Sequence, residues 1–178
     1  MRTHHLLVAA ATAAFLMLGI SGTASADTTG PTTATVTIEG GFLSITVPVD
    51  AGNLGTHVNS VDGGTISGPL GQVQVSDARS APAGSGWVAS AISTAFTPPA
   101  GPAIAASFVG YTAGAITQVG TATYTANDPA DLTGVSPVVT ATGITGDNSA
   151  TWNPMINVSV AGGMAAGVYS ATITHSVV

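Results

Sequence analysis

The sequence predicts an all-β protein: a single antiparallel β-sandwich, immunoglobulin-like or Greek-key in type, that follows a cleaved signal peptide. From residue 27 onward, 50 of 152 residues are Val, Ile or Thr and only four are Leu. Branching at Cβ favours pleated strands over helices. Lysine is absent and glutamate occurs once, so helices have little from which to build a solvated face. Alternating segments recur about every ten residues between turn signals, which is typical of sandwiches.

The N-terminus is interpreted as an export signal. A basic residue precedes an apolar run at 6–20, and the small residues at 24–26 form a cleavage site. The run has 15 residues, whereas a membrane-spanning helix needs about 20. We therefore expect a signal peptide at 1–26 and one secreted domain at 27–178 without a membrane span; the alternative is an uncleaved anchor. The C-terminus carries no hydrophobic tail, so attachment to a surface would be non-covalent.

The first half of the mature chain contains four expected strands, at 35–39, 43–49, 72–77 and 87–96. Gly40-Gly41 indicates a hairpin turn between the first two. The second strand is expected to bury Leu43, Ile45, Val47 and Val49, and the third Val73, Val75 and Asp77. A long loop with room for one short strand spans 50–69. In the fourth segment Val88, Ile92 and Phe96 recur every four positions, which fits a helix or a strand. The all-β composition favours a strand.

The second half contains five expected strands, at 104–111, 115–125, 138–142, 156–160 and 168–178. The three prolines in 97–102 require an irregular connection, and turn residues predict turns at 127–131 and 146–148. The last two strands show the clearest alternation, with one apolar and one polar face. We expect those two strands to pair with each other.

Charge and composition exclude several classes of function. The mature chain carries one arginine and eight acids, a net charge of −7, which disfavours nucleic acid and anionic membranes as partners. The absence of cysteine excludes thiol catalysis, thiolate metal sites and disulfides, and the absence of lysine excludes Schiff-base enzymes. Two histidines, His57 and His175, remain after processing, and no zinc-binding pattern is present. We predict no enzymatic activity, no cofactor and no metal.

Asp77 and Arg79 lie two positions apart in an extended segment, so their side chains share a face and can form a charge-assisted hydrogen bond. Arg79 is either a ligand contact or half of a structural ion pair that fixes the loop before Trp87, and we favour the ion pair. Trp87 and Trp152 are expected in the core, the usual place for tryptophan in a sandwich. The alternative is a partly exposed ring that stacks on a sugar.

Three stretches together resemble the WxL-domain proteins, secreted surface proteins of Gram-positive bacteria: Val75-Ser76-Asp77-Ala78-Arg79, Gly86-Trp87-Val88 and the closing segment 167–177. The family has a Val-x-Asp-x-Arg stretch that leads through a short loop to Gly-Trp-x-Leu. It ends with a strand of the pattern Gly-x-Tyr-x-Ala-x-Ile/Leu-Thr-Trp-x-Leu. The resemblance covers roughly 35–178. Ala89 stands at the first leucine position, and His175 and Val177 replace the second tryptophan and leucine.

The resemblance implies a non-catalytic protein of the cell wall, bound non-covalently to peptidoglycan or another surface polymer, with other surface proteins as possible partners. The candidate ligand-binding residues are Asp77, Arg79, Trp87, Tyr169 and His175. Because the chain is strongly negative, binding would depend on stacking and hydrogen bonds and would weaken little with salt. The alternative is a structural or adhesive subunit that assembles by edge-strand pairing with itself or another surface protein, with the last strand as the candidate edge.

Overall fold

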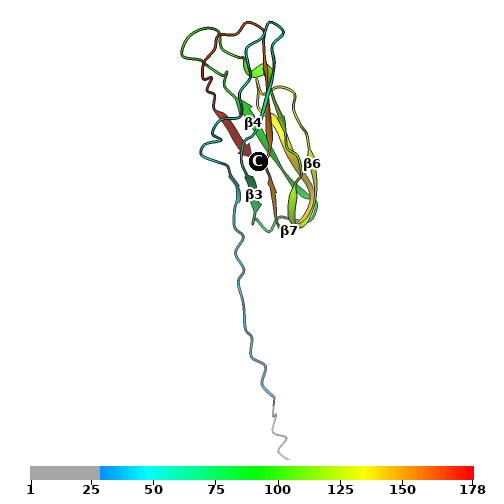
Figure 1. The fold of residues 1–178 in the computed structure, drawn as a ribbon. Helices are drawn as coiled ribbons and strands as arrows, with labels where there is room; N and C mark the ends of the chain where they lie inside the picture. The colour runs from blue at the N-terminus through cyan, green and yellow to red at the C-terminus, as the bar shows by residue number, and fades with distance from the viewer. Residues whose placement is uncertain (1–28) are drawn as a thin grey trace, which may run out of the picture. The chain divides into compact units, whose positions relative to one another are not determined.

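The computed structural model describes residues 29–178, which contain nine strands and one short 3-10 helix (Figure 1). The chain divides after Thr37 into two units, and residues 38–178 form one of them. The expected signal peptide at 1–26 lies outside the described residues. The elements are β1 (Leu43–Thr46), β2 (Gly64–Pro69), β3 (Val73–Asp77), β4 (Ser85–Ser93), η1 (Ala106–Phe108), β5 (Val109–Thr112), β6 (Thr117–Ala126), β7 (Ser136–Trp152), β8 (Met155–Val160) and β9 (Ile173–Val177).

The strands form two antiparallel sheets, which confirms the predicted all-β, sandwich-like fold. The larger sheet has the order β1-β3-β7-β4-β9, and the smaller has the order β2-β8-β5. Strand β7 pairs with β4 over its first half and with β3 over its last five residues. Strand β6 pairs along the other side of β7, since Ala150 has both Val75 and Gln118 as partners. Among the described residues, no helix is long and apolar enough to cross a membrane.

Alternation places the core where the sequence predicts it in several strands. Val73, Val75 and Asp77 of β3 are buried, as are Ile156 and Val158 of β8. The long loop after β1 contains one strand near its end, β2, and the proline-rich connection at 97–102 has no strand beyond an isolated bridge at Thr97. These predictions are confirmed. Their common feature is a clean two-residue period between recognisable turn residues.

The first expected strand is not formed. Residues 29–42 belong to no strand, and Val36 and Ile38 are each 88 % exposed. Alternation shows that a segment can pair, but a strand also needs a neighbouring edge. The second strand is shorter than expected, because β1 ends at Thr46 and leaves Val47 and Val49 exposed rather than buried.

Strand β4 is a strand, as predicted, but it buries the opposite face. Ala89 and Ala91 are buried, whereas Val88 and Ile92 are half-buried. Trp87 sets this face, because residues two apart on a strand point the same way and the indole is fully inside. Ala89 and Ala91 lie on the same face of β4 as Trp87 and are therefore buried with it.

The strand expected at 138–142 and the turn expected at 146–148 are parts of one 17-residue strand, β7. Gly143 and Gly146 have φ of 63° and 70°, in the left-handed region that glycine adopts without steric cost. The pairing of β6 with β7 shifts register on either side of Thr121, opposite these glycines. The glycines therefore produce irregularities that bend a continuing strand instead of ending it.

The last two expected strands do not pair with each other. Strand β8 lies between β2 and β5 in the smaller sheet, whereas β9 pairs with β4 in the larger one. The connection at 161–172 contains three glycines and crosses between sheets instead of making a hairpin. Two further bounds differ: β9 begins at Ile173, and the 3-10 helix η1 occupies the middle of the expected strand 104–111, so β5 begins at Val109.

Candidate functional site

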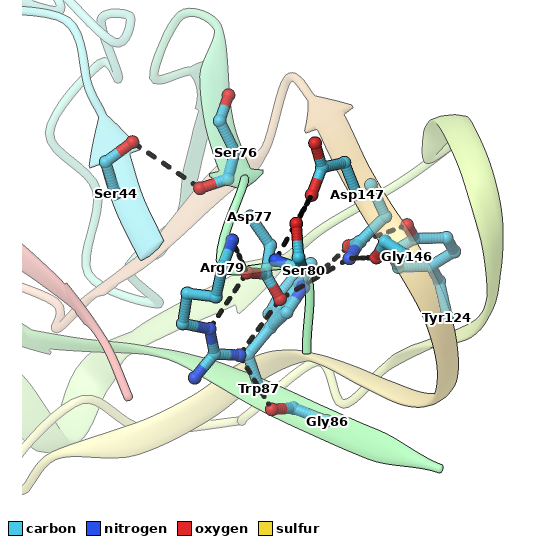
Figure 2. Close-up of polar contacts among 11 residues, drawn as sticks. Ser44, Ser76, Asp77, Arg79, Ser80, Gly86, Trp87, Tyr124, Gly146 and Asp147 are labelled. Atoms are coloured by element: carbon cyan, nitrogen blue, oxygen red, sulfur yellow. Dashed lines mark hydrogen bonds and ion pairs between the residues drawn. The ribbon is translucent and has the colours of Figure 1, made fainter. Parts of the chain in front are cut away.

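The first motif of the sequence forms a polar cluster at the junction of β3, β4 and β7. Asp77 is the last residue of β3, Trp87 lies near the start of β4, and Asn148 lies in β7 opposite Asp77. The loop at 78–84 connects β3 to β4 and contains Arg79. Because β3 and β4 flank the same side of β7, the register of the sheet brings these side chains together (Figure 2).

Asp77 and Arg79 form the expected ion pair, and it is bidentate. Arg79 donates from Nε to Asp77 Oδ1 at 2.8 Å and from Nη2 to Oδ2 at 2.9 Å, while its backbone N–H donates to Oδ1 at 3.1 Å. The Asp77 side chain is 1 % exposed and the Arg79 side chain 36 %. Hydrogen bonds from Arg79 lower the pKa of Asp77 below its usual value, and the bond to Asp77 raises the pKa of Arg79.

Trp87 is a core residue rather than an exposed platform, since it is 2 % exposed. Its indole Nε1 donates to Asn148 Oδ1 at 3.0 Å, and Asn148 Nδ2 donates to Asp77 Oδ2 at 3.4 Å. Tyr124 of β6 donates its hydroxyl to the same Asn148 oxygen at 3.3 Å, and its ring lies 5.8 Å from that of Trp87 between centroids. Burial raises the pKa of Tyr124.

The loop between β3 and β4 is fastened at two further points (Figure 2). Arg79 Nη2 also donates to the carbonyl of Gly86 at 3.2 Å. Ser80, which has φ of 52°, donates from its backbone N–H to Asp147 Oδ1 at 3.2 Å and from its hydroxyl at 3.3 Å. A non-glycine residue in the left-handed region requires such support. The charged pair thus fixes the path of the loop.

The second motif position lies in a different cluster. His175 of β9 places Nε2 3.2 Å from the hydroxyl of Tyr111 in β5, and Trp152 of β7 donates its Nε1 to the same hydroxyl at 2.8 Å. Tyr111 is 1 % exposed and Trp152 is 2 % exposed. Burial lowers the pKa of His175 to about 4 and raises the pKa of Tyr111. His175 therefore lies on the core face as a neutral ring at physiological pH.

Tyr169 stands apart from both clusters. It is half-buried, and its hydroxyl donates to the carbonyl of Ala165 at 2.8 Å. The structure therefore brings three of the five candidate residues, Asp77, Arg79 and Trp87, into one cluster. It places His175 in a second cluster and gives Tyr169 a local contact.

We call the first cluster the polar clamp; it consists of Asp77, Arg79, Trp87, Tyr124 and Asn148, whose side chains hydrogen-bond to one another. The Asp77 carboxylate accepts four hydrogen bonds from protein groups. Throughout residues 29–178, every buried side-chain nitrogen or oxygen has a hydrogen-bond partner. Within the same range, no group of three or more His, Asp or Glu side chains is placed to hold a metal ion. The cluster presents no buried polar group that awaits a ligand.

The surface of the described chain includes the following two open depressions. One, of about 280 Å³, is lined by Thr94, Ala95, Thr97, Ser170, Ala171 and Thr172. The other, of about 260 Å³, lies beside β5 and includes Asp128 and Asn157. Four of the six residues that line the first depression carry hydroxyl groups, and the depression adjoins the start of β9.

Sequence reasoning did not identify the partners that complete the two clusters: Asn148, Tyr124, Asp147 and Tyr111. The sequence pattern around Asp147 and Asn148 predicts a turn, whereas their contacts with Ser80 and Asp77 depend on a register between strands about 70 residues apart. The one available signal was the burial expected of Trp87 and Trp152, because a buried indole N–H requires an acceptor.

No family model, no curated protein and no solved structure matches the chain. The fold and the two clusters define the class as an all-β, sandwich-like protein with a polar clamp on its largest sheet. The resemblance to WxL domains stays a prediction that depends on the motif residues.

Proposed function

We propose that the chain is a secreted, non-catalytic structural subunit of a bacterial cell surface, held there non-covalently, that assembles by pairing the edges of its sheets. The observation that carries the proposal is β6, a ten-residue strand whose one partner within residues 29–178 is β7. An exposed strand edge displays a row of backbone donors and acceptors that another chain can satisfy. Backbone pairing needs no charged or catalytic side chain, which agrees with a chain that lacks lysine and cysteine.

The geometry of the first motif favours this function over recognition of a ligand by Asp77 and Trp87. Both oxygens of the Asp77 carboxylate accept hydrogen bonds from Arg79, and the ring of Trp87 is buried in the core. A sugar would have to displace Arg79 or Asn148 before it reached either residue. The motif is better explained as the device that holds the loop between β3 and β4.

Binding to a cell-wall polymer is the second candidate, and the depression beside β9 favours it. Thr94, Thr97, Ser170 and Thr172, which line that depression, carry hydroxyl groups, and hydroxyl groups suit the hydroxyl-rich surface of a glycan. Such binding would use the exposed side of the second motif and not the half-buried His175, which faces the core. It would change little with salt, since no charged side chain lines the depression.

Sedimentation velocity of the chain from Asp27 onward tests the leading proposal. We expect oligomers that grow with protein concentration and disappear when Thr121 and Thr123, exposed on β6, are both changed to Glu. The matched control is Thr142→Glu with Thr145→Glu, which adds the same charge to their cross-strand neighbours on the central strand β7. The control should still assemble.

A single monomeric species at every concentration would contradict the leading proposal. If that monomer still pelleted with purified cell walls, and Thr97→Ala with Thr172→Ala abolished the pelleting, wall binding would replace assembly as the function.

A further inference from the structure

Residues 33–39 have the sequence of a strand but pair with no strand in the described part of the chain. Threonines and Glu39 alternate with Ala34, Val36 and Ile38, which gives the segment one polar and one apolar face. Every described residue from 29 to 40 is exposed. Exposed β-branched apolar residues in a row are uncommon in a monomer and mark interaction sites.

Strand β6 is the longest strand in the described chain that pairs on one side only. Its sequence contains no charge and no proline, the two devices that most often protect an edge from further pairing. On its inner face Ala122 and Tyr124 pack against the core but stay half-buried. A further strand beside β6 would cover these two side chains.

The edges of the smaller sheet are covered by their own loops. Leu54 lies against Gly68 of β2, where even a Cβ atom would not fit. Pro129 accepts a hydrogen bond at 2.9 Å from the backbone of Tyr111 in β5. In the larger sheet, β1 and β9 are short and approach each other. Strand β6 is therefore the edge best suited to accept a strand.

The polar clamp fixes the point at which the N-terminal segment leaves the domain. Gly41 donates its backbone N–H to the carbonyl of Ala78 at 2.6 Å. A Cβ on Gly41 would lie 2.8 Å from that of Ala78, and one on Gly40 would lie 3.0 Å from the carbonyl oxygen of Arg79. Both glycines are needed for this close approach. The segment thus starts beside the Asp77–Arg79 pair, at the β1 side of the sheet.

The whole segment cannot lie along β6 of its own chain, because its C-terminal end is held too far from that edge. Strands β3 and β7 separate β1 from β6, which places β6 about 14 Å away at about 4.8 Å per strand. An extended chain from Gly41 to Ile38 spans at most about 10 Å. A second copy has no such restriction.

We propose that residues 33–39 of one copy add as a strand to the β6 edge of a second copy. This inference rests on the proposed function and names its partner. The seven residues span about 23 Å and β6 about 33 Å, so the donor fits within the acceptor. On the added strand, Ala34, Val36 and Ile38 lie on the same face of the sheet as Ala122 and Tyr124 of β6 and cover these two side chains. Since donor and acceptor are different surfaces, the contact is heterologous, and it generates a filament when the rotation between successive copies does not close a ring.

The test compares three forms of the chain from Asp27 onward by sedimentation velocity and negative-stain microscopy. The parent should form filaments. Val36→Pro with Ile38→Pro should be monomeric, because proline removes backbone donors from the added strand. The control, Val36→Ile with Ile38→Val, keeps the strand pattern and should form filaments. Both positions are exposed outside any strand, so circular dichroism should show the same folded domain in all three.

A synthetic peptide of residues 31–41 supplies the second measurement. It should bind the monomeric proline variant at one peptide per chain, and a peptide with the same two prolines should bind at least about tenfold more weakly. Binding should be lost when Thr121 and Thr123 of the receiving chain are changed to Glu.

The outcomes separate the two proposals. If the proline variant still forms filaments, residues 33–39 are not the donor, although assembly through edges stands. If the peptide binds the Thr121→Glu, Thr123→Glu chain as well as the parent edge, β6 is not the acceptor. If the parent chain is monomeric at every concentration, the proposed function itself is wrong.

Discussion

Trp87 and Trp152 are buried to the same extent in the core but belong to two different kinds of hydrogen-bond network. Each is 2 % exposed, and each donates its indole N–H to a polar side chain. The acceptor of Trp87 is Asn148, which continues to the charged pair of Asp77 and Arg79. The acceptor of Trp152 is the hydroxyl of a tyrosine that continues to a neutral histidine.

The two networks also connect different parts of the fold. The first joins side chains from β3, β4, β6 and β7, all in the larger sheet. The second joins Trp152 and His175 of the larger sheet to Tyr111 of the smaller one. The comparison indicates that a charged clamp holds strands and a loop within one sheet, whereas a neutral chain of hydrogen bonds fastens one sheet to the other. The charged network reaches solvent through Arg79, which makes its charge tolerable.

The largest expected effect tests whether the two indoles are equivalent as core residues. Trp87→Ala and Trp152→Ala should each lower the free energy of unfolding by about 3–5 kcal/mol, because both rings are buried to the same extent. Urea unfolding followed by circular dichroism measures the loss, with Val119→Ala on the exposed side of β6 as a control that changes little. A loss of less than about 1 kcal/mol for either tryptophan would show that its ring is not part of the core.

An intermediate effect should distinguish the charged network from the neutral one. Asp77→Ala removes four accepted hydrogen bonds, three of them from Arg79, and should cost about 2–3 kcal/mol. Tyr111→Phe leaves the indole N–H of Trp152 without its acceptor and should cost about 1–2 kcal/mol. The same urea measurement applies, and a larger loss for Tyr111→Phe would reverse the order of the two networks.

Asp77→Ala should also loosen the loop that the clamp holds. Hydrogen exchange of the backbone amides at 78–86 should accelerate in this variant and not in Tyr111→Phe, whose network does not touch the loop. Equal protection of the loop in both variants would contradict the role assigned to the ion pair.

The elements that the sequence predicted correctly are those whose pattern is local. Val73 and Val75 in β3, and Ile156 and Val158 in β8, alternate within one strand, and the Asp77–Arg79 pair spans two residues. The predictions that were wrong or missing concern features that depend on residues far away in the sequence. Val36 and Ile38 alternate as cleanly but pair with no strand within residues 29–178. Asn148 is placed beside Asp77 by the register of β3 on β7, which the sequence does not reveal. Gly143 and Gly146 allow bends within β7, and the residues at these bends are of the same types as those in a turn.

The smallest expected effect is a pH dependence confined to the neutral network. The pKa of His175 falls from 6.5 to about 4 because of burial, so the unfolded chain binds a proton more readily between these values. Stability is then complete above pH 6.5 and declines toward pH 4, by on the order of 1–2 kcal/mol between pH 7 and 5. The pKa of Asp77 is lowered instead, so the contribution of the clamp is present above pH 3.8 and is lost only in stronger acid.

His175→Phe isolates that dependence, since the ring keeps its place on the apolar face of β9 but cannot take up a proton. Urea unfolding of this variant between pH 7 and 5 should show a flatter profile than the parent. His57→Gln removes the other histidine of residues 27–178, an exposed one, and should leave the parent profile intact. If His57→Gln flattens the pH dependence of stability instead, the acid sensitivity belongs to the loop before β2. The neutral network that connects the two sheets would then not differ from the charged network in its response to pH.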